Sequence, residues 1–170
     1  MRITIITIIF ACVSIYSFSQ ISNDKEIEKA FEIARTPENN ECQLFYGFKF
    51  GMTENEYNLE LDSLTQADKA ICKDGKYLIG RYGHSGECHF QTLFPKFEND
   101  KLIELTVFFT RERFTLKELI YDLKFESTNS TIYLRKDKGN DIFLCFKKNI
   151  LVTCGFMDNK YLVFRYESLK

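Results

Sequence analysis

Residues 141–166 read DIFLCFKKNILVTCGFMDNKYLVFRY, and this stretch decides the fold. Aromatic, aliphatic and β-branched residues fill three short runs, at 141–146, 150–156 and 161–166. Polar turn formers separate these runs at 148–149 and 158–160. A fourth run, 131–135, comes before Lys138-Gly139-Asn140. The pattern predicts a meander of four antiparallel strands.

Three more strands are predicted upstream of the meander. The segments 76–83, 88–97 and 102–110 are rich in aromatic and β-branched residues. Turn signals separate them at 84–86 and 98–101. Tight turns of this kind favour antiparallel pairing between consecutive strands.

Helix signatures lie before and between the two groups of strands. Asn23 and Glu26 form a capping box that predicts a helix over 24–35. Thr53 and Glu56 predict a second helix in the same way. The inward stripe of this second helix is formed by Tyr57, Leu61 and Leu64.

Thr115 and Glu118 form a third capping pair, which predicts a helix from Thr115 to about residue 124. The similar helix starts at Thr53 and Thr115 hint at a duplicated unit. Together the elements predict an α+β domain, with an antiparallel sheet of about six to seven strands and two to three helices packed on one face.

Residues 1–19 have the pattern of a secretion signal. Arg2 precedes an apolar run over 3–16, and Ser17 and Ser19 occupy the two small positions before a cleavage site at Gln20. We therefore expect an exported protein, periplasmic or secreted, with one globular domain over 20–170. The alternative is a lipid anchor through Cys12, but Phe10 is bulky for a lipoprotein signal and the chain stays apolar after the cysteine.

Composition narrows the class of protein. The formal net charge of −1 offers no general attraction for nucleic acid or an anionic membrane. The charge runs at 111–113 and 134–138 both contain acidic residues, which favours solvated turns over a basic binding face. The 17 Phe and 9 Tyr supply ample core material and argue against disorder.

Five cysteines remain outside the predicted signal, namely Cys42, Cys72, Cys88, Cys145 and Cys154. Their odd number leaves at least one unpaired thiol in a monomer. The predicted hairpins place Cys88 opposite Tyr82 and Cys145 opposite Val152, so neither forms a comfortable cross-strand bridge. One disulfide and buried free thiols stay open as alternatives.

The segment 48–56 contains Phe50-Gly51-Met52-Thr53-Glu54-Asn55-Glu56. It resembles the FGMT-x-x-E opening of many small exported proteins of Gram-negative bacteria. The layout of helices and strands over 45–110 is also similar, more remotely, to β-lactamase-inhibitor-like modules and small outer-membrane-assembly lipoproteins. The resemblance implies protein binding rather than catalysis. Those families place a Gly-x-Pro turn after the helix, which residues 64–68 lack, and no functional residue is carried over.

Two candidate sites of chemistry lie between residues 72 and 89. Gly83-His84-Ser85-Gly86-Glu87 approaches the nucleophile elbow Gly-x-Ser-x-Gly, but the segment after it predicts a strand where the elbow needs a helix. A hairpin turn is the favoured interpretation. The second candidate gathers the residue types that bind zinc, without the usual ligand spacing, in Cys72, His84, Cys88 and His89.

We therefore assign no catalytic, cofactor-binding or metal-binding residue. The sequence favours an exported, non-catalytic binding or structural module that recognises an unknown protein partner. The alternative is a zinc-dependent or thiol-based enzyme centred on residues 72–89. An inhibitor of the immunity type is a further possibility, which sequence does not separate from other binding proteins.

Overall fold

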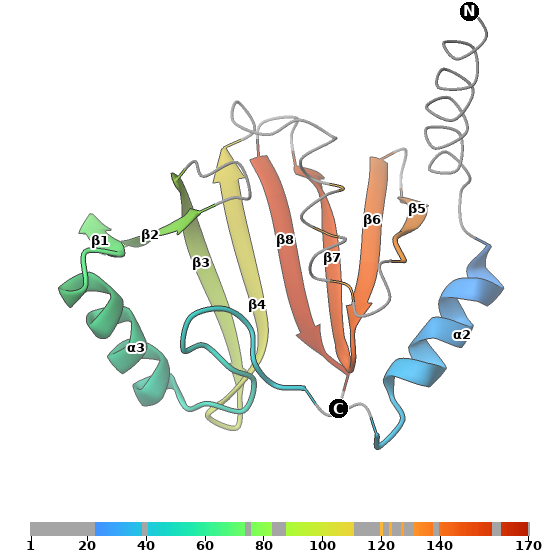
Figure 1. The fold of residues 1–170 in the computed structure, drawn as a ribbon, viewed down its shortest axis with the longest axis horizontal. Coiled ribbons are helices and arrows are strands. Elements are labelled where there is room, and N and C mark those ends of the chain that lie inside the picture. Colours follow the sequence, from blue (N-terminus) through green and yellow to red (C-terminus); the bar gives the residue numbers. More distant parts are fainter. Residues whose placement is uncertain are drawn as a thin grey trace, which may run out of the picture.

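A single antiparallel sheet of eight strands forms the centre of the computed structural model (Figure 1). The structure describes residues 23–38, 41–73, 76–82, 88–110, 120, 123, 127, 131–137, 140–157 and 161–169. The strands are β1 (Ala70–Lys73), β2 (Lys76–Tyr82), β3 (Cys88–Glu98), β4 (Lys101–Thr110), β5 (Tyr133–Asp137), β6 (Asn140–Lys147), β7 (Ile150–Met157) and β8 (Tyr161–Ser168). The described helices are α2 (Asp24–Ala34) and α3 (Glu54–Gln66).

The strand order is β1-β2-β3-β4-β8-β7-β6-β5. Two meanders of four strands therefore meet where β4 pairs with β8. The meander predicted from residues 131–166 is confirmed, and its central hairpin has the expected register, with Lys147 opposite Ile150 and Cys145 opposite Val152. The predicted pairing of Tyr82 with Cys88 is also confirmed.

The predicted fold class is wrong. The protein is mostly β, with eight strands instead of six or seven, and its two described helices do not share a face of the sheet. The additional strand, β1, has only four residues and a burial pattern without alternation, so it carries no period-two signal. It lies at the sheet edge and pairs only with β2.

The sheet has two faces that we call inner and outer. The inner face carries Leu105 and Val107 of β4, both fully buried, and α3 contributes Tyr57, Leu61 and Leu64 to the same core. The segment 44–52 packs on this face as well. The inner face therefore holds the main hydrophobic core, and the predicted inward stripe of α3 is confirmed.

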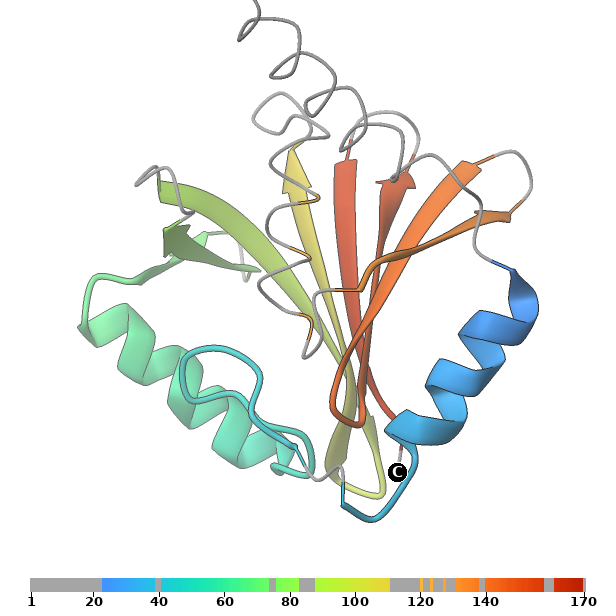
Figure 2. The same ribbon diagram turned by 45° about the vertical axis from the view of Figure 1, so that its right-hand side comes forward.

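Helix α2 packs on the outer face. Its residues Ile27 and Ala34 join a second cluster with Leu144, Phe146 and Leu151, which alternate along β6 and β7 with inner-face residues. The ring centroids of Phe31 and Phe146 are 5.0 Å apart in an edge-to-face contact. Helices α3 and α2 thus lie on opposite sides of the sheet (Figure 2).

Of the three predicted capping boxes, those at Asn23 and Thr53 are present, and the one at Thr115 lies outside the described residues. The Asn23 side chain accepts from the backbone of Lys25, and the Glu26 carboxylate reaches back to the Asn23 N–H. At α3, the Thr53 hydroxyl accepts a hydrogen bond from the Glu56 N–H. The Glu56 carboxylate in turn accepts one from the Thr53 N–H at 2.7 Å. Each pair satisfies backbone donors that the first turn of a helix leaves open.

Two other expectations fall largely outside the described residues. The signal segment 1–19 lies outside them, and of the predicted third helix only Ile120 and Leu123 are described. Leu123 is fully buried in the inner core, where its carbonyl accepts from the Cys145 thiol at 3.5 Å. No helix within the described ranges is long and apolar enough to span a bilayer.

Candidate functional site

The FGMT-x-x-E segment has structural roles. Phe50 and Met52 are buried in the inner core. Gly51 adopts a φ of +83°, a conformation that favours glycine. Its N–H donates to the Leu102 carbonyl at 2.9 Å, which anchors the segment to the start of β4. Since Thr53 and Glu56 form the cap of α3, these contacts of the motif support the fold.

The predicted cysteine and histidine cluster does not assemble around both of its thiols. Cys72 on β1 pairs with Tyr77, whereas Cys88 on β3 pairs with Tyr82. The two cysteines are therefore five β2 residues apart along the strands, about 17 Å at 3.3 to 3.4 Å per residue. Zinc ligands lie about 2.0 to 2.3 Å from one ion, so Cys72 and Cys88 do not share one.

The structure describes only one of the two histidines of this cluster. His84 lies outside the described residues, and His89 pairs through its backbone with Arg81. The segment after the elbow-like sequence is the strand Cys88–Glu98, paired antiparallel with β2. The predicted strand after this sequence is therefore confirmed, where an elbow needs a helix. Cys72 and Cys42 are exposed free thiols on separate elements.

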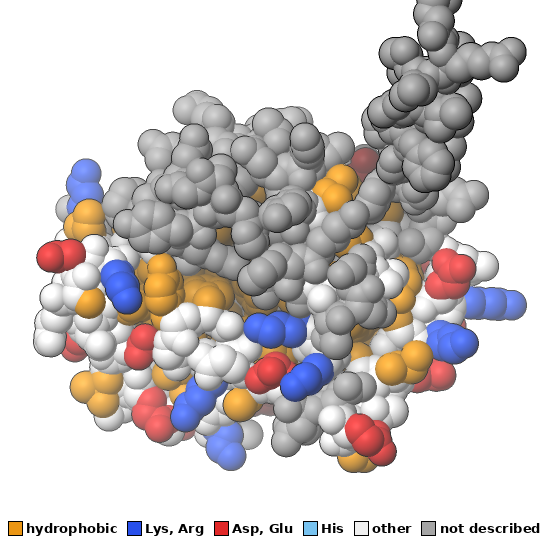
Figure 3. Space-filling model, in the orientation of Figure 1, with side chains coloured by type: hydrophobic (Ala, Val, Ile, Leu, Met, Phe, Trp, Pro, Cys, Tyr) orange, Lys and Arg blue, Asp and Glu red, His pale blue; other side chains and the backbone are white. Residues whose placement is uncertain are grey.

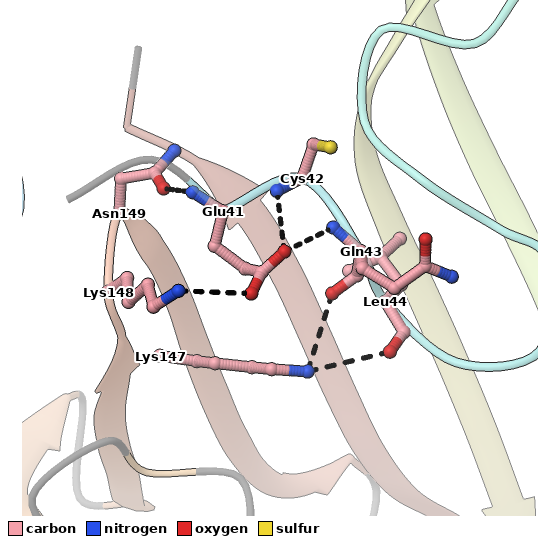
Figure 4. A network of polar contacts seen from close by, with 7 residues as sticks. All are labelled: Glu41, Cys42, Gln43, Leu44, Lys147, Lys148 and Asn149. Carbon is pink, nitrogen blue, oxygen red and sulfur yellow. Dashed lines mark hydrogen bonds and ion pairs between the residues drawn. The ribbon is translucent and has the colours of Figure 1, made fainter.

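A polar network ties the chain after α2 to the turn between β6 and β7 (Figure 4). The Glu41 carboxylate accepts from the N–H groups of Cys42 and Gln43 at 3.0 and 2.9 Å, and its other oxygen lies 3.5 Å from Lys148 Nζ. The hydrogen bond from Gln43, followed by that from Cys42 and by the charges of Lys148 and Lys147, lowers the pKa of Glu41 despite partial burial.

Two further residues complete the network. Buried Asn149 accepts from Glu41 N–H through its side chain and from Leu169 N–H through its carbonyl. Lys147 Nζ donates to the carbonyls of Gln43 and Leu44 at 3.3 and 3.5 Å. The network holds the connection that leads from α2 on the outer face to the core segment on the inner face. The polar groups of this network bind one another within the chain, so the role of the network is structural.

Gln91 is the buried polar residue that the fold explains least. It is fully buried on the inner face of β3, opposite Ile79. Among the described residues, neither its amide nitrogen nor its amide oxygen has a hydrogen-bond partner. A buried amide without partners costs about 1–3 kcal/mol. Gln91 is therefore a weak point of the core.

The outer face carries a mostly apolar row that crosses seven of the eight strands. Each member pairs with the next through the strand register: Ile71, Leu78, Thr92, Phe108, Val163, Gly155 and Ile142. Phe94 lies on the same face of β3, two residues from Thr92, with its ring 4.9 Å from Phe108 in an edge-to-face contact. Tyr161 continues the aromatic series beside Phe108 at 6.3 Å.

This row is partly exposed over the half of the sheet that α2 does not cover. Ile71 is 52% exposed and Phe94 is 48% exposed, whereas Phe108 and Val163 are half-buried. On the inner face of the same strands, Leu105 and Leu162 are fully buried. A group of exposed apolar side chains on one face is typical of an interaction surface, while a single exposed residue is not.

Charged residues border the row. Arg165 on β8 pairs with Glu104 at 2.6 Å and lies 3.5 Å from Glu167. At the sheet edge, Lys73 and Lys76 lie directly opposite each other on β1 and β2, and neither has an ion-pair partner within the described part of the chain. On the molecular face seen in Figure 3, acidic and basic side chains are intermixed among the described residues.

Comparison with known proteins yielded no match, either among protein-family models, among curated proteins or among solved structures. The resemblance of residues 48–56 to a motif of small exported bacterial proteins therefore stays a prediction.

The apolar row on the outer face was not predicted from the sequence. One signal was present, because residues 142–146 and 150–152 are apolar at consecutive positions, which is typical of a strand buried on both faces. That signal locates the half covered by α2. The exposed half has a similar pattern over 107–109, and sequence alone does not say which half is covered.

Proposed function

We propose that this chain is an exported, non-catalytic module that binds a partner protein through the half of the outer sheet face that no described helix covers. The observation that carries the proposal is the apolar row, with Ile71 and Phe94 about half exposed at one end. Export is supported by the signal-like pattern of residues 1–19.

The surface has the make-up of a recognition patch. Protein interfaces are enriched in aromatic residues at their centre and in polar residues at their rim. Here Phe94, Phe108 and Tyr161 lie next to one another, and charged residues surround them. A zinc site that uses both Cys72 and Cys88 is not supported, because the register separates these two residues.

The test compares two pairs of exposed apolar residues. The double variant I71S/F94S removes exposed side chains from the outer face, and I33S/L59S removes equally exposed side chains from the two helices. Each protein is expressed in the native host and isolated by affinity, and the bound proteins are quantified by mass spectrometry. We expect a partner that I71S/F94S loses at least tenfold and that I33S/L59S retains. A partner that both variants retain contradicts the proposal.

A further inference from the structure

We propose that the half of the outer sheet face that no described helix covers binds an acidic amphipathic helix of the partner protein. This inference rests on the proposed function and specifies the kind of segment that is bound.

Helix α2 shows what the same face already accepts. Its sequence, DKEIEKAFEIA, has four acidic and two basic residues. One stripe of Ile27, Ala30, Phe31 and Ala34 packs against the outer face of β6 and β7. The covered half of the face therefore binds an acidic helix through small and aromatic apolar side chains.

The two halves of the sheet are equivalent in topology. The strand order reads outward from the β4–β8 pair as β4-β3-β2-β1 on one side and β8-β7-β6-β5 on the other. An antiparallel pair has a local twofold axis perpendicular to the sheet, so this axis relates the two meanders and keeps the outer face outward. The region that α2 covers on β6 and β7 thus corresponds to the exposed region on β2 and β3.

The dimensions suit a helix of ordinary length. The row from Ile71 on β1 to Val163 on β8 crosses five strands. At about 4.8 Å between strands this distance is about 19 Å, which a helix of about 13 residues spans at 1.5 Å per residue. Helix α2 has 11 residues. A single helix of similar size would cover the exposed row.

The charges favour an acidic occupant. Lys73 and Lys76 are exposed and directly opposite each other, an arrangement that is repulsive across an antiparallel pair. Leu78, two residues along β2 from Lys76, pairs with Thr92, which is two residues along β3 from Phe94. A carboxylate beside the apolar stripe of a bound helix would relieve this repulsion.

The experiment uses two synthetic helical peptides of 13 residues and the full chain. Both peptides carry the α2 spacing of apolar residues; one has glutamate at the flanking positions and the other has lysine. Affinity is measured by fluorescence anisotropy at low salt, where surface charge acts most strongly. We expect the glutamate peptide to bind at least tenfold more tightly than the lysine peptide.

Three variants locate the interaction. F94S is expected to lower the affinity for the glutamate peptide at least tenfold. L59S changes an exposed residue on α3 and is expected to leave this affinity unchanged. The charge reversal K73E/K76E is expected to invert the preference between the peptides. Circular dichroism establishes that each variant is folded.

Several results overturn the inference. These are equal binding of the two peptides, a preference for lysine, no binding of either peptide, or displacement of the glutamate peptide by single-stranded DNA. The isolation experiment with I71S/F94S tests the proposed function independently of the peptides. A failure of the helix inference is therefore distinguishable from a failure of the proposed function.

Discussion

Phe94 and Phe108 lie edge to face on neighbouring strands, with their ring centroids 4.9 Å apart. Phe94 is 48% exposed, although the side chains of Leu105 and Val107 on the opposite face are fully buried. An edge-to-face pair of this kind contributes about 0.5–1.5 kcal/mol beyond its buried area. The contact holds both rings in place at a surface that no described helix covers, which suits a preformed binding patch.

The two faces of the sheet should differ in their contribution to stability. Leu105→Ala removes a fully buried side chain, and we expect it to lower the free energy of unfolding by about 3 kcal/mol. Phe94→Ala should cost only about 1 kcal/mol, because half of the ring already contacts water. Urea denaturation at pH 7 measures both values. Equal losses would mean that the outer face is covered in solution.

Replacement of Gln91 should stabilise the protein. Gln91→Leu places an apolar side chain of similar size where a buried amide has no partner among the described residues. We expect the free energy of unfolding to rise by about 1 kcal/mol. Gln91→Ala is the control, since it removes the amide but leaves a cavity. A loss of more than about 1 kcal/mol in Gln91→Leu would show that the amide has a partner in solution.

The Glu41 network should make stability depend on acid. Hydrogen bonds from Gln43 and Cys42 lower the pKa of Glu41 below its ordinary value of 4.5. A carboxyl with a lowered pKa in the folded state stabilises the fold above its unfolded pKa, and this contribution is lost as the pH falls through the folded pKa. Glu41→Gln should therefore be less stable than the wild type at pH 7, and the difference should shrink at pH 3. A difference that is constant across this range contradicts the assignment.

Removal of the α3 cap tests the role given to the FGMT-x-x-E segment. Thr53→Ala deletes the hydroxyl that accepts from Glu56 N–H at 3.2 Å. We expect a loss of about 1 kcal/mol in thermal or urea unfolding, with partner binding unchanged. If Thr53→Ala abolished partner binding without a loss of stability, the segment would have a functional role that its contacts do not show.

Local signals in the sequence predicted the elements well. The capping boxes at Asn23 and Thr53 and the register at Lys147 and Ile150 depend on residues close together in the chain, and all three are present. The predicted position of the helices depended on long-range packing. The stripe of Ile27 and Phe31 establishes that α2 has a buried side, but it does not determine which face of the sheet it meets.

The binding surface was missed for the same reason. Apolar residues at 107, 108 and 109 supply both faces of β4, so their pattern predicts two buried sides. Exposure of Phe94 follows from the positions of α2 and α3, which are set by contacts between distant segments. Cys72 and Cys88 lie apart because they pair with Tyr77 and Tyr82, five residues apart on β2, and this register does not follow from their closeness in the sequence.

The most direct test of the binding surface places a photo-crosslinking amino acid at position 94 and, in a matched protein, at position 59 on α3. Both sites are about half exposed or more. After irradiation in the native host, we predict a single discrete cross-linked product from position 94 and none from position 59. Equal cross-linking from both positions, or a product from position 59 alone, would contradict the claim that the outer sheet face binds the partner.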